Sequence, residues 1–139
     1  MITPHWEHFE HQADMGVRGF GNIPAEAFEQ VALATSAIIT DLQLINPAHE
    51  INIFCEETDQ ELLLVDWLNA LIFEMSTRKM LFNQFKVHLD NGKLTASAWG
   101  ERTNVKRHQP AVEIKGATYT ELAVYKSQDH WVAQCVVDV

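Results

Sequence analysis

Hydrophobic residues recur at helical spacing in the first third of the chain. Five of them fall on one stripe: Phe28, Val31, Thr35, Ile38 and Leu42. Such a stripe is typical of an amphipathic helix that packs on one side. Pro24 suits the first turn of this helix, because the N–H that Pro lacks would have no partner there. The pattern predicts a helix from Pro24 to near Asp41.

A second helical segment, "LLLVDWLNALIFEM" at residues 62–75, is apolar on nearly every face. A helix of this kind is expected to be largely buried. Thr58 and Glu61 precede it with the spacing of a capping box, which indicates where the helix begins. Asp66 and Asn69 are polar exceptions along one side, and Glu74 lies a turn further on.

Apolar and polar residues alternate elsewhere, which predicts strands. The segments with this pattern are 51–56, 85–89, 94–98, 111–126 and 131–138, and the glycine-rich stretch 11–21 is interpreted as containing an opening strand. Asp90-Asn91-Gly92 is a strong hairpin turn, because Asn-Gly accepts positive φ at low cost. The stretch 111–126 reads as one long or broken strand with a bulge at Gly116, and residues 127–129 turn it into the last strand.

The predicted order is therefore strand, helix, strand, helix and then two hairpins. Two helices cannot cover both faces of a large sheet. We therefore expect an α+β fold, a two-layer sandwich in which a mixed, largely antiparallel sheet carries two helices on one face. No linker-like or repetitive stretch divides the chain, so residues 1–139 are expected to form a single domain.

Composition and charge narrow the function classes. The chain has 47% hydrophobic residues and a formal net charge of -9. This charge argues against nucleic-acid binding and against an anionic membrane surface, and it suits cations or a basic partner protein. No secretory signal and no membrane-length apolar run is visible, so a cytoplasmic protein is expected. Cys55 and Cys135 sit in alternating apolar runs and are predicted to be core residues rather than a disulfide or redox pair.

Catalytic signatures such as G-x-S-x-G, a Walker loop or H-E-x-x-H are absent from the sequence. The regular spacing of His5, His8 and His11 suggests a zinc or nickel site. Such a site would need all three side chains to converge on the metal. Asp14 precedes a glycine-rich strand and Asp138 ends one. They are either a turn residue and a solvated strand end, or oxygen ligands of a hard cation such as calcium or magnesium.

Four blocks together resemble the archease family. These are "HQADMGVRGFG" at residues 11–21, "VDWLN" within the second helix, "EIKGATYTEL" at 113–122, and the final Asp138-Val139. The resemblance implies a small helper protein that activates the manganese- and GTP-dependent RNA ligase of tRNA splicing and RNA repair. Such a helper promotes guanylylation of the ligase and its turnover, and it carries no catalytic residues. The ligase, not this chain, would hold the RNA.

The resemblance also implies site residues. Asp14, Asp138 and the main-chain oxygen of Val139 would bind a divalent cation, expected to be calcium, with magnesium or manganese as alternatives. Lys115 and Tyr119 would contact the partner ligase. Three positions depart from the family pattern: Gly116 replaces an alanine, Thr120 a histidine and Ala70 an acid. The oligomeric state is left open.

Two other functions stay open, the first from the residues and the second from the family resemblance. One is a metal-dependent hydrolase in which Asp14 and Asp138 hold the ion and Glu74, Asp66 or His11 is the base. The other is a chaperone or a modulator of a tRNA methyltransferase. His11 is given no role beyond supporting the loop at Asp14. Gly16 and Gly19 are interpreted as places where small residues let other main chain approach.

Overall fold

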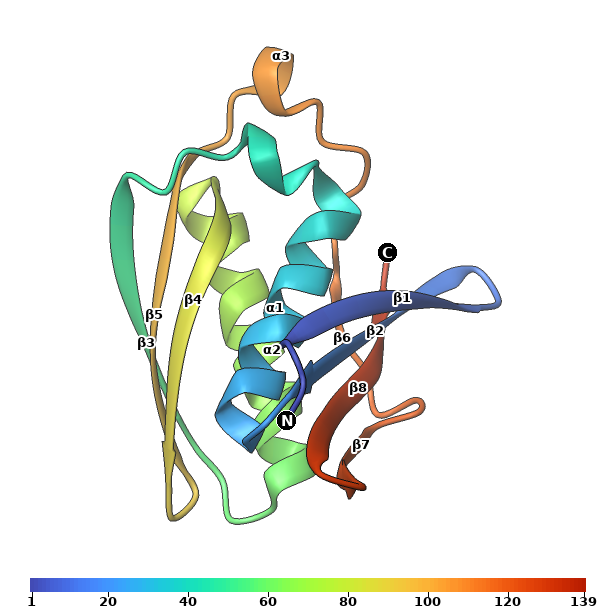
Figure 1. The fold of residues 1–139 in the computed structure, drawn as a ribbon. Coiled ribbons are helices and arrows are strands. Elements are labelled where there is room, and N and C mark those ends of the chain that lie inside the picture. Colours follow the sequence, from blue (N-terminus) through green and yellow to red (C-terminus); the bar gives the residue numbers. More distant parts are fainter.

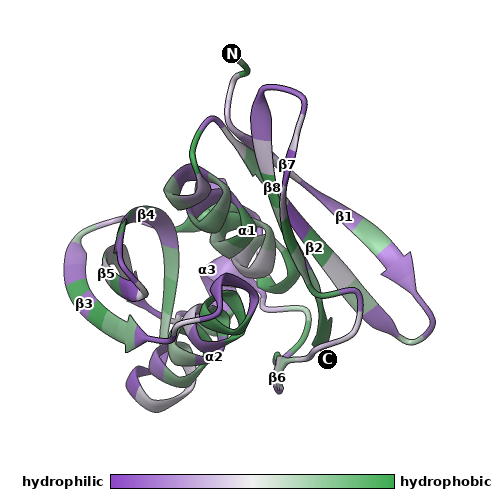
Figure 2. Ribbon diagram, turned by 90° about the horizontal axis from the view of Figure 1, so that it is seen from below, coloured by the Kyte–Doolittle hydropathy of each residue, from purple (hydrophilic) through white to green (hydrophobic).

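Two antiparallel sheets enclose a pair of helices in the computed structural model, which describes residues 1–139 (Figures 1 and 2). The helices are α1 (Pro24–Ile39), α2 (Gln60–Arg78), the short α3 (Val105–His108) and a 3-10 turn, η1 (Leu42–Leu44). The smaller sheet has the order β3-β5-β4, with β3 at His49–Glu56, β4 at Met80–Asp90 and β5 at Lys93–Arg102. The larger sheet has the order β1-β2-β8-β6, and β7 also pairs with β8. Its strands are β1 (His5–His11), β2 (Asp14–Gly21), β6 (Gly116–Ala117), β7 (Ala123–Ser127) and β8 (His130–Asp138).

The expected α+β class with antiparallel strands is confirmed, but the arrangement in two layers is corrected. The strands form two separate sheets, and the helices lie between them rather than on one face of a single sheet (Figure 2). Helix α1 packs against β2 on one side and β4 on the other, and α2 reaches both β3 and β6. The physical reason is that the two helices bury apolar residues on more than one side and need cover there, while one stripe of α2, with Leu62, Asp66, Asn69 and Phe73, stays exposed.

Helix α1 lies very close to β2, and two glycines allow this. A Cβ added at Gly19 would lie 2.3 Å from the Ala27 carbonyl oxygen, and one at Gly21 would lie 2.7 Å from the Ala27 nitrogen. Main chain therefore approaches main chain at Gly19, as interpreted from the sequence. Gly16 differs, because the space beside it is filled by the ring of Phe9, not by main chain.

Trp67 joins the two helices at the centre of the core. Its side chain is fully buried, and the indole Nε1–H donates to the Phe28 carbonyl of α1 at 3.0 Å. The ring also meets Phe85 of β4 edge to face, with centroids 6.0 Å apart. One residue of α2 therefore fixes the position of α1 and of the smaller sheet.

The predicted helix and hairpin positions are mostly confirmed, with local differences. The β4–β5 turn uses positive φ at Asn91 and Gly92, as the Asn-Gly signal predicts. The cap of α2 is Asp59 rather than Thr58: its carboxylate accepts the N–H groups of Glu61 and Leu62. Residues 5–11 form β1, which the sequence pattern did not predict.

The long strand predicted at 111–126 is wrong in its first part. Residues 111–115 have no regular structure, and strand geometry is limited to β6 and β7. Residues 103–115, which we call the strap, run from the end of β5 to the start of β6 (Figure 1). Three backbone hydrogen bonds anchor it: Thr103 N–H to Lys79 O, Ala111 N–H to Ile39 O and Lys115 N–H to Asp138 O.

Both cysteines are buried free thiols, as expected. Burial raises the pKa of Cys55 to about 11 and that of Cys135 to about 12, so both thiols stay protonated near neutral pH. Neither α1 nor α2 is long and apolar enough to cross a membrane.

Glu101 holds the beginning of the strap through three partners. Its carboxylate accepts from Arg107 at 2.7 Å, from the Asn46 backbone N–H at 2.7 Å and from Nε2 of buried His108 at 2.9 Å. The Asn104 N–H donates to Nδ1 of His108, so Nε2 carries the hydrogen that Glu101 accepts. Arg107 first, and then Asn46, lower the pKa of Glu101 from its ordinary 4.5 to about 2.

This shift predicts a pH-dependent contribution of Glu101 to stability. A lowered folded-state pKa contributes stability above pH 4.5 that is lost as the pH falls through about 2. Glu101→Gln is therefore expected to lower the Tm at pH 7, and the difference from the parent protein should shrink steadily below pH 4.5. Thermal unfolding followed by circular dichroism across this range measures it. A Tm difference that stays constant down to pH 2 would contradict the assignment.

Candidate functional site

The two acids singled out in the sequence come together at the edge of the larger sheet. Strands β2 and β8 pair with Met15 opposite Val137, so the next residues in register, Asp14 and Asp138, lie side by side. Residues opposite each other on antiparallel strands point to the same face. The Val139 N–H lies 3.4 Å from Oδ1 of Asp14, which confirms the close approach of the strand ends.

Strand alternation sets the face on which these carboxylates lie. Val17, Cys135 and Val137 point into the core between the sheets. Asp14 and Asp138 alternate with them and therefore point away from α1, on the outer face of the sheet. Both are half-buried. The pair is therefore open to solvent on one side and close to main chain on the other.

The electrostatics of this pair favour a cation. Like charges directly opposite each other on a sheet are destabilising. Neither Asp14 nor Asp138 takes part in any of the ion pairs of the structure. No group of three His, Cys, Asp or Glu side chains converges here, so further ligands would be main-chain oxygens and water. Two carboxylates with main-chain oxygens suit a hard cation such as Ca²⁺, and not zinc, which prefers nitrogen and sulfur.

Strand β6 borders the pair on its other side, and Asn69 of α2 holds it. Gly116 pairs with Asp138, and the Lys115 N–H donates to the Asp138 carbonyl at 2.8 Å. The Asn69 side-chain oxygen accepts the Ala117 N–H at 2.8 Å. Asn69 thus ties the buried helix to the strand beside Asp138. In the sequence, Asn69 stands out only as a polar residue on an otherwise apolar helix. That polar position was the one signal of its contact with β6.

The structure places Lys115 next to the acid pair and Tyr119 two residues after the end of β6. Lys115 is exposed and directly precedes the residue that pairs with Asp138. Tyr119 is 70% exposed, and its neighbours Thr118 and Thr120 both bond to the backbone of Val136. Both side chains are therefore accessible to a partner.

The three regularly spaced histidines do not form a metal site. Strand alternation sends His8 to the face opposite His5 and His11. His8 Nε2 lies 2.7 Å from the Ala34 carbonyl of α1, and His5 stacks on Phe20 with ring centroids 4.4 Å apart. The zinc or nickel interpretation is corrected on this geometry. His11 pairs with Asp14 across the β1–β2 turn and so flanks the acid pair.

Two of the three candidate bases for a hydrolase are engaged elsewhere. Glu74 accepts from Arg78 at 2.8 Å on α2. Asp66 lies near Glu57 and Cys55 at the smaller sheet, where burial, and then Glu57, raise its pKa. Of the three candidates, only His11 lies beside Asp14, its partner across the β1–β2 turn. The arrangement therefore suits cation binding, but only His11 is placed to act as a base that activates water.

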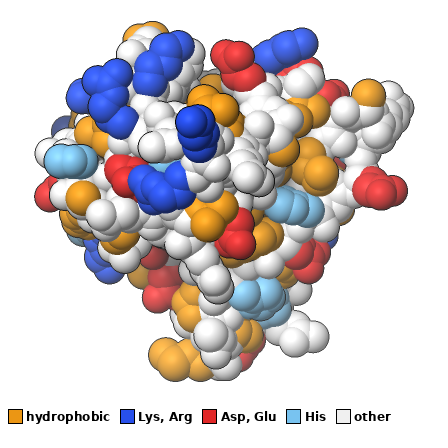
Figure 3. Space-filling model, turned by 90° about the horizontal axis from the view of Figure 1, so that it is seen from above, with side chains coloured by type: hydrophobic (Ala, Val, Ile, Leu, Met, Phe, Trp, Pro, Cys, Tyr) orange, Lys and Arg blue, Asp and Glu red, His pale blue; other side chains and the backbone are white.

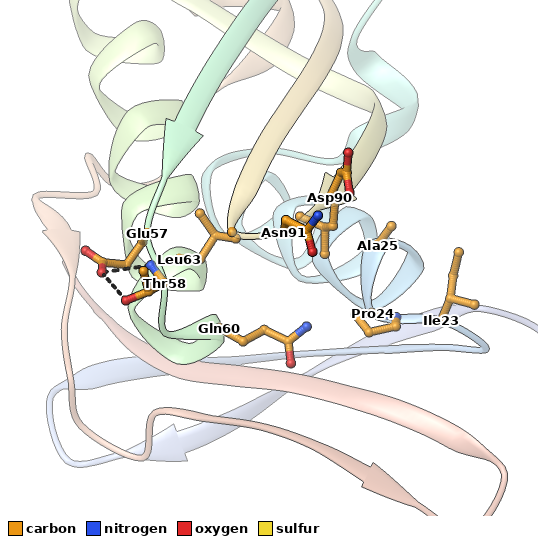
Figure 4. A pocket seen from close by; sticks show the side chains of 11 residues that line it. Ile23, Pro24, Ala25, Glu57, Thr58, Gln60, Leu63, Asp90 and Asn91 are labelled. Carbon is orange, nitrogen blue, oxygen red and sulfur yellow. Dashed lines mark hydrogen bonds between the residues drawn. The ribbon is translucent and has the colours of Figure 1, made fainter.

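The largest cavity lies away from the acid pair. A cavity of about 400 Å³ opens between the first turns of α1 and α2 and the β4–β5 turn (Figure 4). Glu57 and Asp90 are its acidic side chains, and Glu57 accepts from its neighbour Thr58 within the wall. None of the candidate site residues lines it, so it plays no part in the candidate cation site.

Comparison with known proteins gives one consistent result. A sequence model of the Archease protein family matches residues 6–139. Proteins named archease are similar over 96% of this chain: that of Pyrococcus furiosus is 38% identical and covered over 98% of its length, and that of Methanosarcina barkeri is 36% identical and covered over 95%.

Solved structures agree. The solution structure of Methanobacterium thermoautotrophicum protein 1598 matches with a TM-score of 0.85 at 32% identity, covering 96% of this chain and 98% of that one. A Thermotoga maritima archease, described as a possible chaperone, matches with a TM-score of 0.60 at 20% identity, covering 94% of each chain, and supports the fold alone.

The Asn69 hydrogen bond is directly testable. Asn69→Ala removes the acceptor of the Ala117 N–H, so we expect a loss of about 0.5–1.5 kcal/mol in unfolding free energy and faster hydrogen exchange at the Ala117 amide. Asn52→Ala is the matched control, since Asn52 bonds only to Glu50 and Ser97 on an exposed sheet face. Unchanged exchange at Ala117 in Asn69→Ala would contradict the positioning role.

Proposed function

Because this chain belongs to the archease family, we propose that it is a protein cofactor that activates a GTP- and manganese-dependent RNA ligase in tRNA splicing or RNA repair. It promotes guanylylation of the ligase and its turnover, and it acts through a divalent-cation site. The relatives are named archease, and the Thermotoga maritima archease is described as a possible chaperone. The observation that carries the proposal is the paired carboxylates of Asp14 and Asp138.

The residues of this chain have distinct parts in the proposed site. Asp14 and Asp138 hold the cation, and the main-chain oxygen of Val139 adds a ligand on the same side. A bound divalent cation supplies positive charge and coordination positions open to oxygen atoms of a partner. Lys115 and Tyr119 stand exposed beside the pair and contact the ligase.

The scaffold around the pair keeps the carboxylates at a fixed separation. The register of β2 on β8 sets their spacing, and Asn69 holds β6 against Asp138. The fold has to hold the two carboxylates in place, because their like charges repel each other in the absence of a cation. Calcium is the expected ion, and magnesium or manganese would use the same oxygen donors.

A second candidate function is a general chaperone or a modulator of a tRNA methyltransferase. The description of the Thermotoga maritima archease as a possible chaperone favours it. The two functions differ in what they require of the cation. A ligase activator that works through the acid pair loses its effect when the pair is removed, whereas suppression of aggregation of unrelated proteins does not depend on it.

The acid pair predicts a reversal of stability order with calcium. Without divalent cation, Asp14→Asn removes like-charge repulsion and should unfold at the same or a higher temperature than the parent protein. With Ca²⁺ at about one hundred times its Kd, the parent protein should gain about 2.7 kcal/mol, and the variant should gain much less. Differential scanning fluorimetry with and without EDTA measures both, and Asp90→Asn on the β4–β5 hairpin is the charge-matched control. Equal calcium responses in all three proteins would refute the cation site.

The ligase proposal has its own test. Purified RNA ligase is incubated with GTP and manganese, and the covalent guanylate on the ligase is quantified with and without this protein. The parent protein and Asp90→Asn should speed guanylylation equally, whereas Asp14→Asn and Asp138→Asn should lose most of the stimulation while keeping their circular dichroism spectra. Full stimulation by folded Asp14→Asn would exclude the cation-centred mechanism, and no stimulation by the parent protein would exclude the ligase role.

A further inference from the structure

Half of the basic side chains gather at one end of this acidic protein. Of its ten Lys and Arg residues, five lie where α2, β5 and α3 meet: Arg78, Lys79, Arg102, Lys106 and Arg107. We call this region the basic end. Figure 3 looks onto it and shows Lys and Arg side chains interleaved with apolar ones and with some Asp and Glu side chains. Arg78 and Arg107 are paired with Glu74 and Glu101, whereas the other three make no ion pair.

An apolar pocket opens at the basic end, beneath the strap. Its volume is about 210 Å³, enough for one large apolar side chain. Its apolar lining comes from the last turns of α1 and α2, the start of β4 and the strap: Ile39, Ile72, Met75, Met80, Leu81, Pro110, Val112 and Ile114. Two methionines give the lining some adaptability. The polar rim consists of Ser76, Lys79, Thr103 and Glu113.

Two exposed apolar side chains lie on the strap that borders the pocket. Val105 on α3 is 70% exposed and Val112 on the strap is 38% exposed. The cations Lys79, Arg102 and Lys106 lie on the segments that carry or border these two valines. Apolar contact area bordered by three unpaired cations, with Glu113 as the one acidic side chain of the lining, is the layout of a recognition surface with an anchoring pocket.

We propose that the basic end binds an acidic segment of a partner protein, which inserts one aliphatic or aromatic side chain into the pocket beneath the strap. Acidic residues flanking that anchor pair with Lys79, Arg102 and Lys106. Glu113 repels them on the opposite rim and so orients the segment toward α3. This surface does not include the acid pair of β2 and β8, and its binding needs neither the ligase nor a divalent cation.

The lining favours a peptide over RNA. Single-stranded nucleic acid is bound through bases that stack on aromatic rings. None of the twelve lining residues is Phe, Tyr, Trp or His. An aliphatic pocket instead fits the apolar side chain of a peptide, and phosphate groups would gain nothing from it.

The test uses a short fluorescein-labelled peptide of aspartate and glutamate residues with one central leucine. Its binding is followed by fluorescence anisotropy at low salt, in EDTA. Ser76→Trp fills the rim of the pocket from the exposed side of α2, and Thr77→Trp places the same bulk on the next residue, outside the pocket. Lys79→Glu removes an unpaired cation, and Lys86→Glu makes the same charge change on β4.

Ser76→Trp and Lys79→Glu should each weaken binding by about tenfold, whereas Thr77→Trp and Lys86→Glu should stay within about twofold. Replacing the central leucine by serine should also weaken binding by about tenfold.

Three results would overturn the proposal. One is equal binding of the leucine and serine peptides. Another is tighter binding of a labelled oligouridine than of the peptide. The third is self-association of the parent protein in sedimentation that Ser76→Trp abolishes, which would make a second copy the occupant.

Discussion

A single buried hydrogen bond, from the Trp67 indole to the Phe28 carbonyl, sets the spacing of the two central helices. The two sheets pack around that helix pair. The pair must be covered on both sides because its buried apolar residues face both sheets, and the two sheets provide the cover. An indole N–H left without a partner in the core would cost about 1–3 kcal/mol in folding free energy. The hydrogen bond therefore both positions the helices and stabilises the fold.

The position of the acid pair follows from this arrangement. The larger sheet lies against α1 through Gly19 and Gly21, which fixes β2. The register then carries Asp14 and Asp138 to the sheet edge on the outer face. From the other side, α2 reaches β6 through Asn69. The candidate cation site is thus half-buried at the sheet edge, and the strands that form it are held by α1 and α2.

The sequence predicts those parts of the structure that local periodicity determines. Both long helices and the β4–β5 hairpin follow from spacing and from Asn91-Gly92. The number of layers did not follow, because an all-round apolar helix shows that cover is needed but not what provides it. Strand β1 was missed because "HWEHFEH" mixes polar and apolar residues on both faces, as an edge strand can. Residues 111–115 alternate like a strand, but they cross between the sheets and find no strand partner.

The five cations of the basic end make the surface charge of this acidic molecule uneven. They are half of its ten Lys and Arg residues, and they lie together on a chain whose net charge is -9. In the field of a charged partner such a molecule rotates before it touches, so that collisions are not random in orientation. Productive encounters become more frequent as ionic strength falls, because the Debye length grows from about 8 Å at physiological salt. The speed with which this protein finds its partners is therefore set by salt as well as by shape.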